Sequence, residues 1–437
     1  MVSSSISTQV IYGHKVSSVV PCSITGDTVY ELSDMDLVMK LHYLHGVYHF
    51  RESDFPTEGL RDKMFPLLDT FAPAAGRIRR SMMGRPHIKC NDSGVRVVEA
   101  QCDKTIDEWF DEKGPFLHHR ELVPGKVIGP ELNFSPLVFV QFTKFKCGGL
   151  AVGLSWPHVL GDAFSAASFI NMWGQLLSGK ILPLKPQHLL QPITKLEKPK
   201  KASLNSEKPF SIKQVPPVED CWMVANENKM ETFSFHFTGT KLKHLLSKVS
   251  GESEAYQYSP FEVISAVIWQ CLAKVREGKG PKMITICKTD TSSKRDRILS
   301  NHQTLSTIKA DFSAAEAKLS MLAELISGEL VNESEVVEEL VDDGSGTPDF
   351  IVFGTNLTFV DMEGIDFYRM EINGQKPVAI NYNINGVGDE GAVLVLHDAE
   401  GVLEARGDSS GRIVTVTLPI EQALHLRNEL EREWGIA

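Results

Sequence analysis

Apolar residues along the chain recur at two spacings, and these spacings predict helices and strands in alternation. Over residues 34–43 and 57–71 the apolar positions lie three and four residues apart, which predicts two amphipathic helices, the second ending before Pro73. Residues 134–143 and 150–156 are rich in β-branched and aromatic residues, and a Cys-Gly-Gly turn separates the two runs. This pattern predicts an antiparallel hairpin.

Capping signals predict where further helices begin. Apolar residues at helical spacing over 162–177, followed by Gly179, predict a helix directly after the hairpin. In the second half, Ser259 stands at an N-cap position, Pro260 follows at the first helical position, and Glu262 completes a Ser-x-x-Glu pair. A helix is therefore expected from residue 260 onward.

The remaining second half contains one more capped helix pattern and several strand-like runs. Ser313 and Glu316 form the same kind of capping pair, which predicts a helix from residue 313 through Ile326. Strands are predicted at residues 231–237, 392–397 and 413–418. Helices mixed with antiparallel strands in both halves predict a mixed α/β fold.

A change of composition marks a predicted domain boundary. Residues 195–214 contain six lysines, two glutamates and two prolines, with no apolar periodicity, which is typical of an exposed connector. We therefore expect two similar-sized domains, residues 1–194 and 222–437, joined by a linker at 195–221. The lysines are interpreted as a solvated connector; the alternative is contact with a lipid surface or a ligand phosphate.

Composition and charge exclude several classes of protein. The chain has 437 residues, of which 42% are hydrophobic and 23% charged, as in an ordinary globular protein with a large core. The net charge of −11 argues against nucleic-acid binding. Seven scattered cysteines without a CxxC pair indicate buried thiols in a reducing compartment and no metal site. We expect neither a signal peptide nor a transmembrane segment.

One segment combines a strand, a histidine and a carboxylate. A predicted strand ends at Trp156, His158 follows on the loop, and the next helix begins near Asp162. A loop imidazole in this position could act as a general base, while Asp162 could stabilise the helix start or hold an arginine. HxxxD is a short pattern, so the spacing alone also fits a histidine bonded to backbone beside an N-cap aspartate.

The order of several segments resembles the BAHD acyltransferases of plants. Residues 75–79 (AGRIR) and 90–95 (CNDSGV) come first, then HVLGD at 158–162, and then the Ser-Pro-Phe-Glu-Val helix start at 259–263. The resemblance extends over nearly the whole chain. It implies a chloramphenicol-acetyltransferase-like fold of two mixed α/β domains with a central channel, and we expect His158 where the domains meet.

The same resemblance implies roles for the HxxxD residues. His158 would be the general base that deprotonates an alcohol or amine, which then attacks an acyl-CoA thioester. Asp162 would keep the loop in shape. No bound cofactor is implied, and acyl-CoA would be a substrate.

The second family motif, DFGWG, is degenerate in this chain. The matching stretch is Asp366-Phe367-Tyr368-Arg369-Met370, so Asp366 is retained while two glycines are lost. The arginines that family members carry after the 259–263 helix are also missing, and Lys288 is the nearest cation. We expect Asp366 to pair with Arg369 or Lys288; the alternative is a carboxylate that accepts from backbone N–H groups.

Four longer segments resemble the Eceriferum-type branch of the BAHD family. These are residues 34–43, 134–149, 356–377 and 380–396. The resemblance implies a role in extending very-long-chain fatty acids for wax or pollen lipids, together with a ketoacyl-CoA synthase, without required transfer chemistry. The isolated protein is expected to be a monomer.

Two alternatives stay open: a CoA-dependent acyltransferase that uses His158, and a pure scaffold with a vestigial channel. The location implied is the cytosolic face of the endoplasmic reticulum, reached through the partner, with cytoplasm and nucleus as alternatives.

Overall fold

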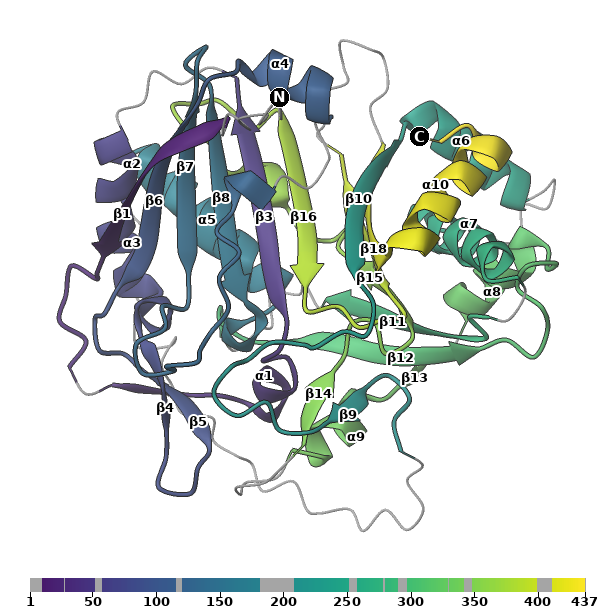
Figure 1. Cartoon of the computed structure of the whole chain (residues 1–437), viewed down its shortest axis with the longest axis horizontal. Coiled ribbons are helices and arrows are strands. Elements are labelled where there is room, and N and C mark those ends of the chain that lie inside the picture. The colour runs from purple at the N-terminus through teal and green to yellow at the C-terminus, as the bar shows by residue number, and fades with distance from the viewer. Residues whose placement is uncertain are drawn as a thin grey trace, which may run out of the picture.

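The structure is a computed structural model of the chain. It describes residues 10–26, 28–51, 57–114, 120–180, 208–250, 258–277, 280–289, 297–328, 330–341, 348–398 and 411–436. Two large sheets organise these residues, and helices pack against both (Figure 1).

The first sheet has six strands and is mainly antiparallel. Only β6 and β7 pair in parallel. The strand order is β1 (Ile11–Val19), β6 (Val95–Cys102), β7 (Phe139–Phe145), β8 (Leu150–Pro157), β3 (Tyr43–Phe50) and β16 (Ala379–Asn385). The predicted hairpin is confirmed as β7 and β8, although its first strand begins at residue 139 rather than 134.

The sequence predicts helix α5 (Ala163–Leu177), which packs on one face of this sheet. The Trp173 ring stacks on Phe142 of β7 at 5.5 Å between centroids, and Phe169 lies 5.6 Å from Trp156 of β8. All four side chains are fully buried. Burying an aromatic side chain stabilises a fold by roughly 1.5–3 kcal/mol, so this layer holds the end of β8 firmly beside the start of α5.

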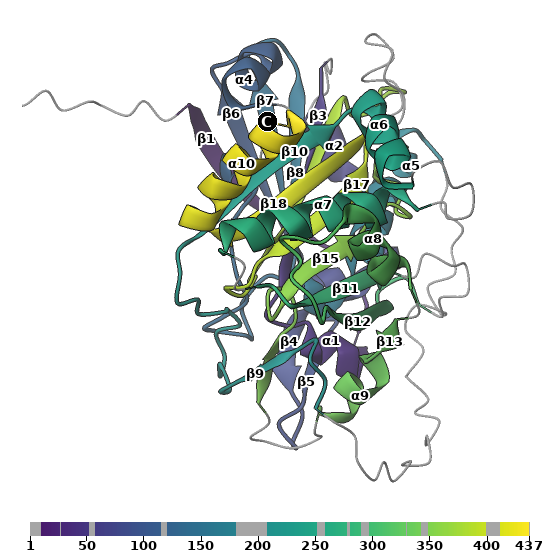
Figure 2. The ribbon, with the colours of Figure 1, turned by 90° about the vertical axis from the view of Figure 1, so that its right-hand side faces the viewer.

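The second sheet has seven strands and lies under four helices. Strands β11, β15 and β17 run parallel at its centre. The order is β10 (Met230–Phe237), β18 (Arg412–Pro419), β17 (Ala392–His397), β15 (Leu357–Asp361), β11 (Met283–Thr289), β12 (Gln303–Lys309) and β13 (Val331–Asn332). The covering helices are α6 (Gly239–Ser250), α7 (Pro260–Val275), α8 (Leu319–Ser327) and α10 (Ile420–Trp434), seen face-on in Figure 2.

Smaller elements complete the described chain. A three-stranded sheet consists of β2 (Val29–Glu31), β5 (Pro86–Lys89) and β4 (Arg77–Arg80), and β14 (Asp349–Ile351) pairs with β9 (Lys213–Val215). The other helices are α1 (Asp34–Val38), α2 (Thr57–Asp62), α3 (Met64–Thr70), α4 (Ile106–Lys113) and α9 (Ser334–Glu339). In this part of the chain, no helix combines the length and apolar character that crossing a membrane requires.

The predicted helix start at Ser259 is confirmed. Its side chain accepts from the Glu262 N–H and the Glu262 carboxylate accepts from the Ser259 N–H, which is a complete capping box. The predicted start at Ser313 is wrong, because helix α8 begins at Leu319 instead. Gln270 of α7 donates to the Ala317 carbonyl at 2.6 Å, so a tertiary contact takes an acceptor that a longer helix would use.

Two helices in the first half are shorter than predicted. The pattern over residues 57–71 forms two helices that break at Lys63, since Pro66 has no N–H to donate to the Asp62 carbonyl. Helix α1 ends at Val38, and Tyr43 begins β3. Strand β3 pairs on both edges, with β8 and with β16, so sheet pairing outweighs the helical pattern there.

One strand of the second half belongs to the first sheet. Strand β16 comes from the second half, yet it extends the first sheet by pairing with β3 over residues 379–385. The predicted linker at 195–221 lies partly in residues 181–207, outside the described chain. The boundaries at 194 and 222 therefore stay a prediction.

Candidate functional site

The HxxxD segment lies at a tight bend between strand β8 and helix α5. A short 3₁₀ helix, η3 (His158–Leu160), follows β8 directly. Gly161 then adopts φ +149°, and a Cβ there would lie 2.5 Å from Ser165 Oγ and 3.0 Å from the Ser300 nitrogen. Only glycine fits both the dihedral and the space, so the bend depends on this residue.

Asp162 joins the two halves of the chain. Its Oδ1 accepts from the Ser165 N–H at 3.1 Å, which makes it the N-cap of α5. Its Oδ2 accepts from the His302 N–H at 3.2 Å, and its own N–H donates to the Ser300 carbonyl at 3.1 Å. The prediction that Asp162 stabilises the helix start is confirmed, and the carboxylate also holds a segment from the second half.

His158 is buried and held by a side chain from the second half. Its side chain is 1% exposed, and Nδ1 lies 3.0 Å from Asn301 Oδ1. Phe353, also from the second half, packs against the ring at 5.3 Å between centroids, while the His158 N–H donates to the His42 carbonyl. The prediction that His158 lies where the two halves meet is confirmed.

The hydrogen bonds of Asn301 decide which nitrogen of His158 carries the proton. The Asn301 Nδ2 donates to the His158 carbonyl and to Asp36 Oδ1, each at 2.8 Å. Oδ1 is therefore the acceptor toward the imidazole, so Nδ1 of His158 is protonated and Nε2 carries the lone pair. Burial lowers the pKa of His158 to about 4, which keeps the ring neutral near pH 7.

Asp36 anchors this chain of side chains. Its Oδ2 accepts from the Ser33 N–H at 2.8 Å in the capping box of α1, while Oδ1 accepts from both the backbone and the side chain of Asn301. Burial raises the pKa of the Asp36 carboxyl, although these hydrogen bonds oppose the shift. Asp36, Asn301 and His158 form one connected path through the junction of the two halves.

A second buried histidine, His42, packs beside His158 in the same site. His42 Nε2 accepts from the Val352 N–H at 3.0 Å, and its ring meets Phe353 edge-on at 4.9 Å. Burial, together with the nearby His158, lowers the pKa of His42 to about 3. His42 is therefore a neutral packing and acceptor group near pH 7.

The degenerate motif lies elsewhere on α5. Asn171 donates to the Asp366 carbonyl at 2.8 Å. Because Asn171 follows Asp162 by nine residues in the helix, this contact lies about 13 Å along α5 from the HxxxD bend. The structure does not bring Asp366 together with His158 and Asp162.

The predicted ion pair of Asp366 is wrong. Asp366 and Arg369 are both exposed, and Lys288 Nζ lies over the Phe261 ring at 5.8 Å. Among the described residues, neither cation lies within salt-bridge reach of Asp366. An exposed carboxylate is satisfied by water and needs no protein cation.

The retained Phe367 of this motif packs against the first sheet. Phe367 lies 4.4 Å from the Tyr382 ring, and the Tyr382 hydroxyl bonds the Tyr48 hydroxyl at 2.6 Å. The segment therefore joins α5 to strands β3 and β16. Within the described chain, no three histidines, cysteines or acids gather in a metal-binding arrangement.

Sequence reasoning missed three polar members of the site, Asp36, His42 and Asn301. Asp36 had a signal, because Ser33-x-x-Asp36 is a capping-box pattern at the start of α1. Asn301 had none, since its partner His158 is 143 residues away in sequence. Only the folded chain shows that the segment after β11 reaches the HxxxD bend.

Comparison of the sequence with known proteins shows the family of this chain. A family model described as "Transferase family" matches residues 13–432. The chain belongs to this family. Protein ECERIFERUM 26-like of Arabidopsis thaliana is 40% identical over 428 residues, which cover 97% of this chain and 96% of that protein. Protein ECERIFERUM 2 of the same plant is 37% identical over 432 residues, covering 95% and 97%.

A solved structure gives the fold of this family member. The crystal structure of vinorine synthase superimposes with a TM-score of 0.69 at 17% identity, covering 97% of this chain and 98% of that one. The chain is thus a member of the BAHD acyltransferase family, in its Eceriferum-type branch, with a chloramphenicol-acetyltransferase-like mixed α/β fold. The predicted family, branch and mixed α/β fold are confirmed, and the central channel stays a prediction. The roles of His158, Asp162 and Asp366 in a reaction stay predictions.

Proposed function

We propose that this family member acts in very-long-chain fatty acid elongation for wax or pollen lipids, working with a ketoacyl-CoA synthase and without transfer chemistry of its own. The observation that carries the proposal is the near full-length similarity to the two ECERIFERUM proteins. The branch resemblance of the sequence implies this role. The partner would bring the chain to the cytosolic face of the endoplasmic reticulum.

The surroundings of His158 support a role other than transfer. A general base must come within hydrogen-bond reach of the hydroxyl or amine that it deprotonates. Here 1% of the His158 side chain is exposed, and Phe353 packs on its ring. The hydrogen bonds of the site join α1, the HxxxD bend and residues 298–302. We therefore assign the site a structural role in holding the two halves together.

The protonation state of His158 favours a second candidate, a CoA-dependent acyltransferase. A neutral ring with its lone pair on Nε2 has the form that a general base requires. Nε2 would take the proton of an alcohol or amine while that nucleophile attacks the thioester carbonyl. The carbon–sulfur bond would then break, and the departing CoA thiolate would receive the proton.

Co-expression distinguishes the two candidates. We expect cells that express a ketoacyl-CoA synthase to make fatty acids two or more carbons longer when this chain is added, measured as methyl esters by gas chromatography. The synthase should co-purify with the tagged chain from detergent-treated membranes. An unchanged fatty-acid profile with both proteins abundant, together with acyl-CoA consumption by the purified chain, would favour the acyltransferase.

A further inference from the structure

The hairpin of strands β4 and β5 carries two exposed methionines at its tip. Met82 and Met83 are 105% and 73% exposed, and they are neighbours in the turn that joins the two strands. The hairpin projects from the body of the molecule (Figure 1). Large apolar side chains that are exposed together on a projecting element mark a contact surface.

Hydrogen bonds fix the shape of this tip. The Ser81 N–H donates to the Arg85 carbonyl, and the Gly84 N–H donates to the Ser81 carbonyl, each at 2.9 Å. Arg80 also donates through Nη1 to the Gly84 carbonyl, at 3.2 Å. The turn that presents the methionines is therefore preformed, so a partner can bind it without first paying to order the chain.

The hairpin is basic, although the chain as a whole is acidic. Residues 77–89 contain four arginines and one lysine and no aspartate or glutamate, whereas the net charge of the chain is −11. Asp220 pairs with Arg80 at 2.8 Å and Asp34 pairs with Arg85 at 2.7 Å, so the cations of the hairpin outnumber the acids that pair with them. Charges farther than about 8 Å are largely screened at physiological salt. A surface that touches the tip therefore meets the charge of the hairpin more than that of the whole chain.

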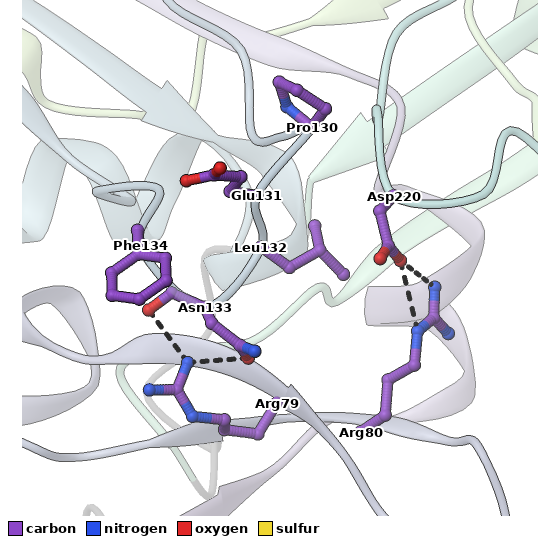
Figure 3. A pocket seen from close by; sticks show the side chains of 8 residues that line it. All are labelled: Arg79, Arg80, Pro130, Glu131, Leu132, Asn133, Phe134 and Asp220. Atoms are coloured by element: carbon purple, nitrogen blue, oxygen red, sulfur yellow. Dashed lines mark hydrogen bonds and ion pairs between the residues drawn. The ribbon is translucent and has the colours of Figure 1, made fainter.

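Arg79 keeps hydrogen-bonding capacity for an anion. Its Nη1 donates to the Asn133 carbonyl and side chain, at 2.9 and 2.8 Å. Among the described residues, its Nε and Nη2 have no hydrogen-bond partner, and in Figure 3 this edge faces away from Phe134 and Glu131. Two N–H groups on one guanidinium edge bind a phosphate or carboxylate with a pair of parallel hydrogen bonds.

The spacing along β4 fits the layers of a membrane surface. Arg80 and Arg79 lie two and three residues before Met82, which corresponds to roughly 7 and 10 Å along an extended strand. The headgroup layer of one leaflet is about 5–8 Å thick. When the methionines reach the acyl chains, both guanidinium groups therefore lie at the level of the lipid headgroups.

The size of the tip argues against a protein partner. Two methionines expose far less surface than the roughly 800 Å² that each partner buries in a stable protein interface. A membrane contact needs only a shallow apolar insertion supported by cations at an anionic surface. The flexible methionine side chain also adapts well to a fluid environment.

We propose that the β4–β5 hairpin docks this chain on an anionic membrane surface. Met82 and Met83 enter the boundary between headgroups and acyl chains, and Arg79 binds the phosphate or carboxylate of an anionic headgroup such as phosphatidylserine. The cytosolic leaflets of cellular membranes carry such lipids. The docking goes beyond the proposed function and does not rest on it, because it needs neither the synthase nor His158.

Vesicle flotation tests the proposal with the purified full chain. We expect wild type to float with vesicles of phosphatidylcholine that contain about 30% phosphatidylserine. Pure phosphatidylcholine should bind at least tenfold more weakly, and high salt should weaken binding to the anionic vesicles. The double substitution M82S/M83S should lower the partition coefficient for anionic vesicles at least tenfold. Arg79→Gln should lower it about fivefold, the usual contribution of one cation near an anionic surface, whereas Arg79→Lys should keep most of the binding.

Matched variants place the same changes at other exposed positions. M321S/L424S removes two exposed apolar side chains from α8 and α10, and Lys309→Gln removes one exposed cation from β12. Both should float as wild type does. Thermal denaturation of every variant checks that a loss of flotation does not come from a loss of folding.

Several outcomes would overturn the proposal. Wild type that stays in solution with the anionic vesicles, or a folded M82S/M83S that floats as wild type does, excludes docking through this hairpin. Equal binding to pure phosphatidylcholine excludes the anionic assignment. Unchanged binding of Arg79→Gln excludes the contact between Arg79 and a headgroup. A wild-type dimer by light scattering that M82S/M83S converts to a monomer would assign the tip to a second copy of the chain.

Discussion

The two segments that match the family motifs differ in how their aspartates are buried and hydrogen-bonded. At the HxxxD bend every polar group of Asp162 is buried and engaged, with partners in both halves. At the degenerate motif Asp366 is exposed, and its backbone carbonyl accepts a hydrogen bond from Asn171. The fold therefore depends on the hydrogen bonds of the Asp162 carboxylate, whereas water can satisfy the Asp366 carboxylate.

The largest expected effect follows from removing the Asp162 carboxylate. Asp162→Ala loses an N-cap and leaves the part-buried His302 N–H without its acceptor, so we expect a loss of about 1–3 kcal/mol in the free energy of unfolding. Urea denaturation followed by tryptophan fluorescence measures it. Asp162→Asn keeps an acceptor at the cap and should lose less. A stability of Asp162→Ala equal to that of wild type would show that the bend does not depend on this side chain.

A smaller effect is expected from the titration of His158. Unfolded histidine binds a proton below about pH 6.5, whereas burial lowers the folded pKa of His158 to about 4. The unfolded state therefore binds more protons between these values, so stability is complete above pH 6.5 and falls as the pH drops toward 4. One such group contributes about 1.4 kcal/mol per pH unit.

A histidine variant isolates this contribution. His158→Gln should flatten the pH dependence of the unfolding free energy by about one proton between pH 6 and 4.5. The raised pKa of Asp36 acts in the opposite direction, and His42 adds to the fall, so the difference between variant and wild type is the informative quantity. Equal slopes for His158→Gln and wild type would contradict a buried neutral His158.

The smallest effect is expected at the degenerate motif. Asp366 is exposed, so Asp366→Ala should change the free energy of unfolding by less than about 0.5 kcal/mol in the same urea assay. A loss as large as that of Asp162→Ala would mean that the carboxylate has a partner essential to the fold, and the contrast between the two segments would disappear.

Local signals in the sequence predicted local structure well. The capping box at Ser259, the turn between β7 and β8 and the N-cap at Asp162 each depend on residues within four positions of one another. Pro66 is also a local signal, because its missing N–H accounts for the break at Lys63. Apolar spacing alone predicted one continuous helix over residues 57–71.

Long-range features could not be predicted from such signals. Strand β16 pairs Asn385 with Tyr43, and Asn301 bonds His158, across separations that leave no periodic trace in the chain. The family resemblance predicted the fold and the position of His158 where the two halves meet. The hydrogen bonds that join Asp36, Asn301 and His158 could be found only in the structure. Asp366 was assigned a cation partner by analogy with the family, and its exposure removed the need for one.

We infer that the HxxxD site holds the two halves of the chain together and that acyl transfer by His158 is not required for function. The substitution His158→Ala tests this inference most directly. The variant is expressed with a ketoacyl-CoA synthase in cells, at protein levels matched to wild type by immunoblot, and the fatty-acid chain lengths are measured. We expect the variant to give the wild-type profile, because the general base is not used. A profile like that of cells without the chain, from a folded and equally abundant variant, would contradict the claim and restore the acyltransferase, since losing a general base costs about 10²–10⁴-fold in rate.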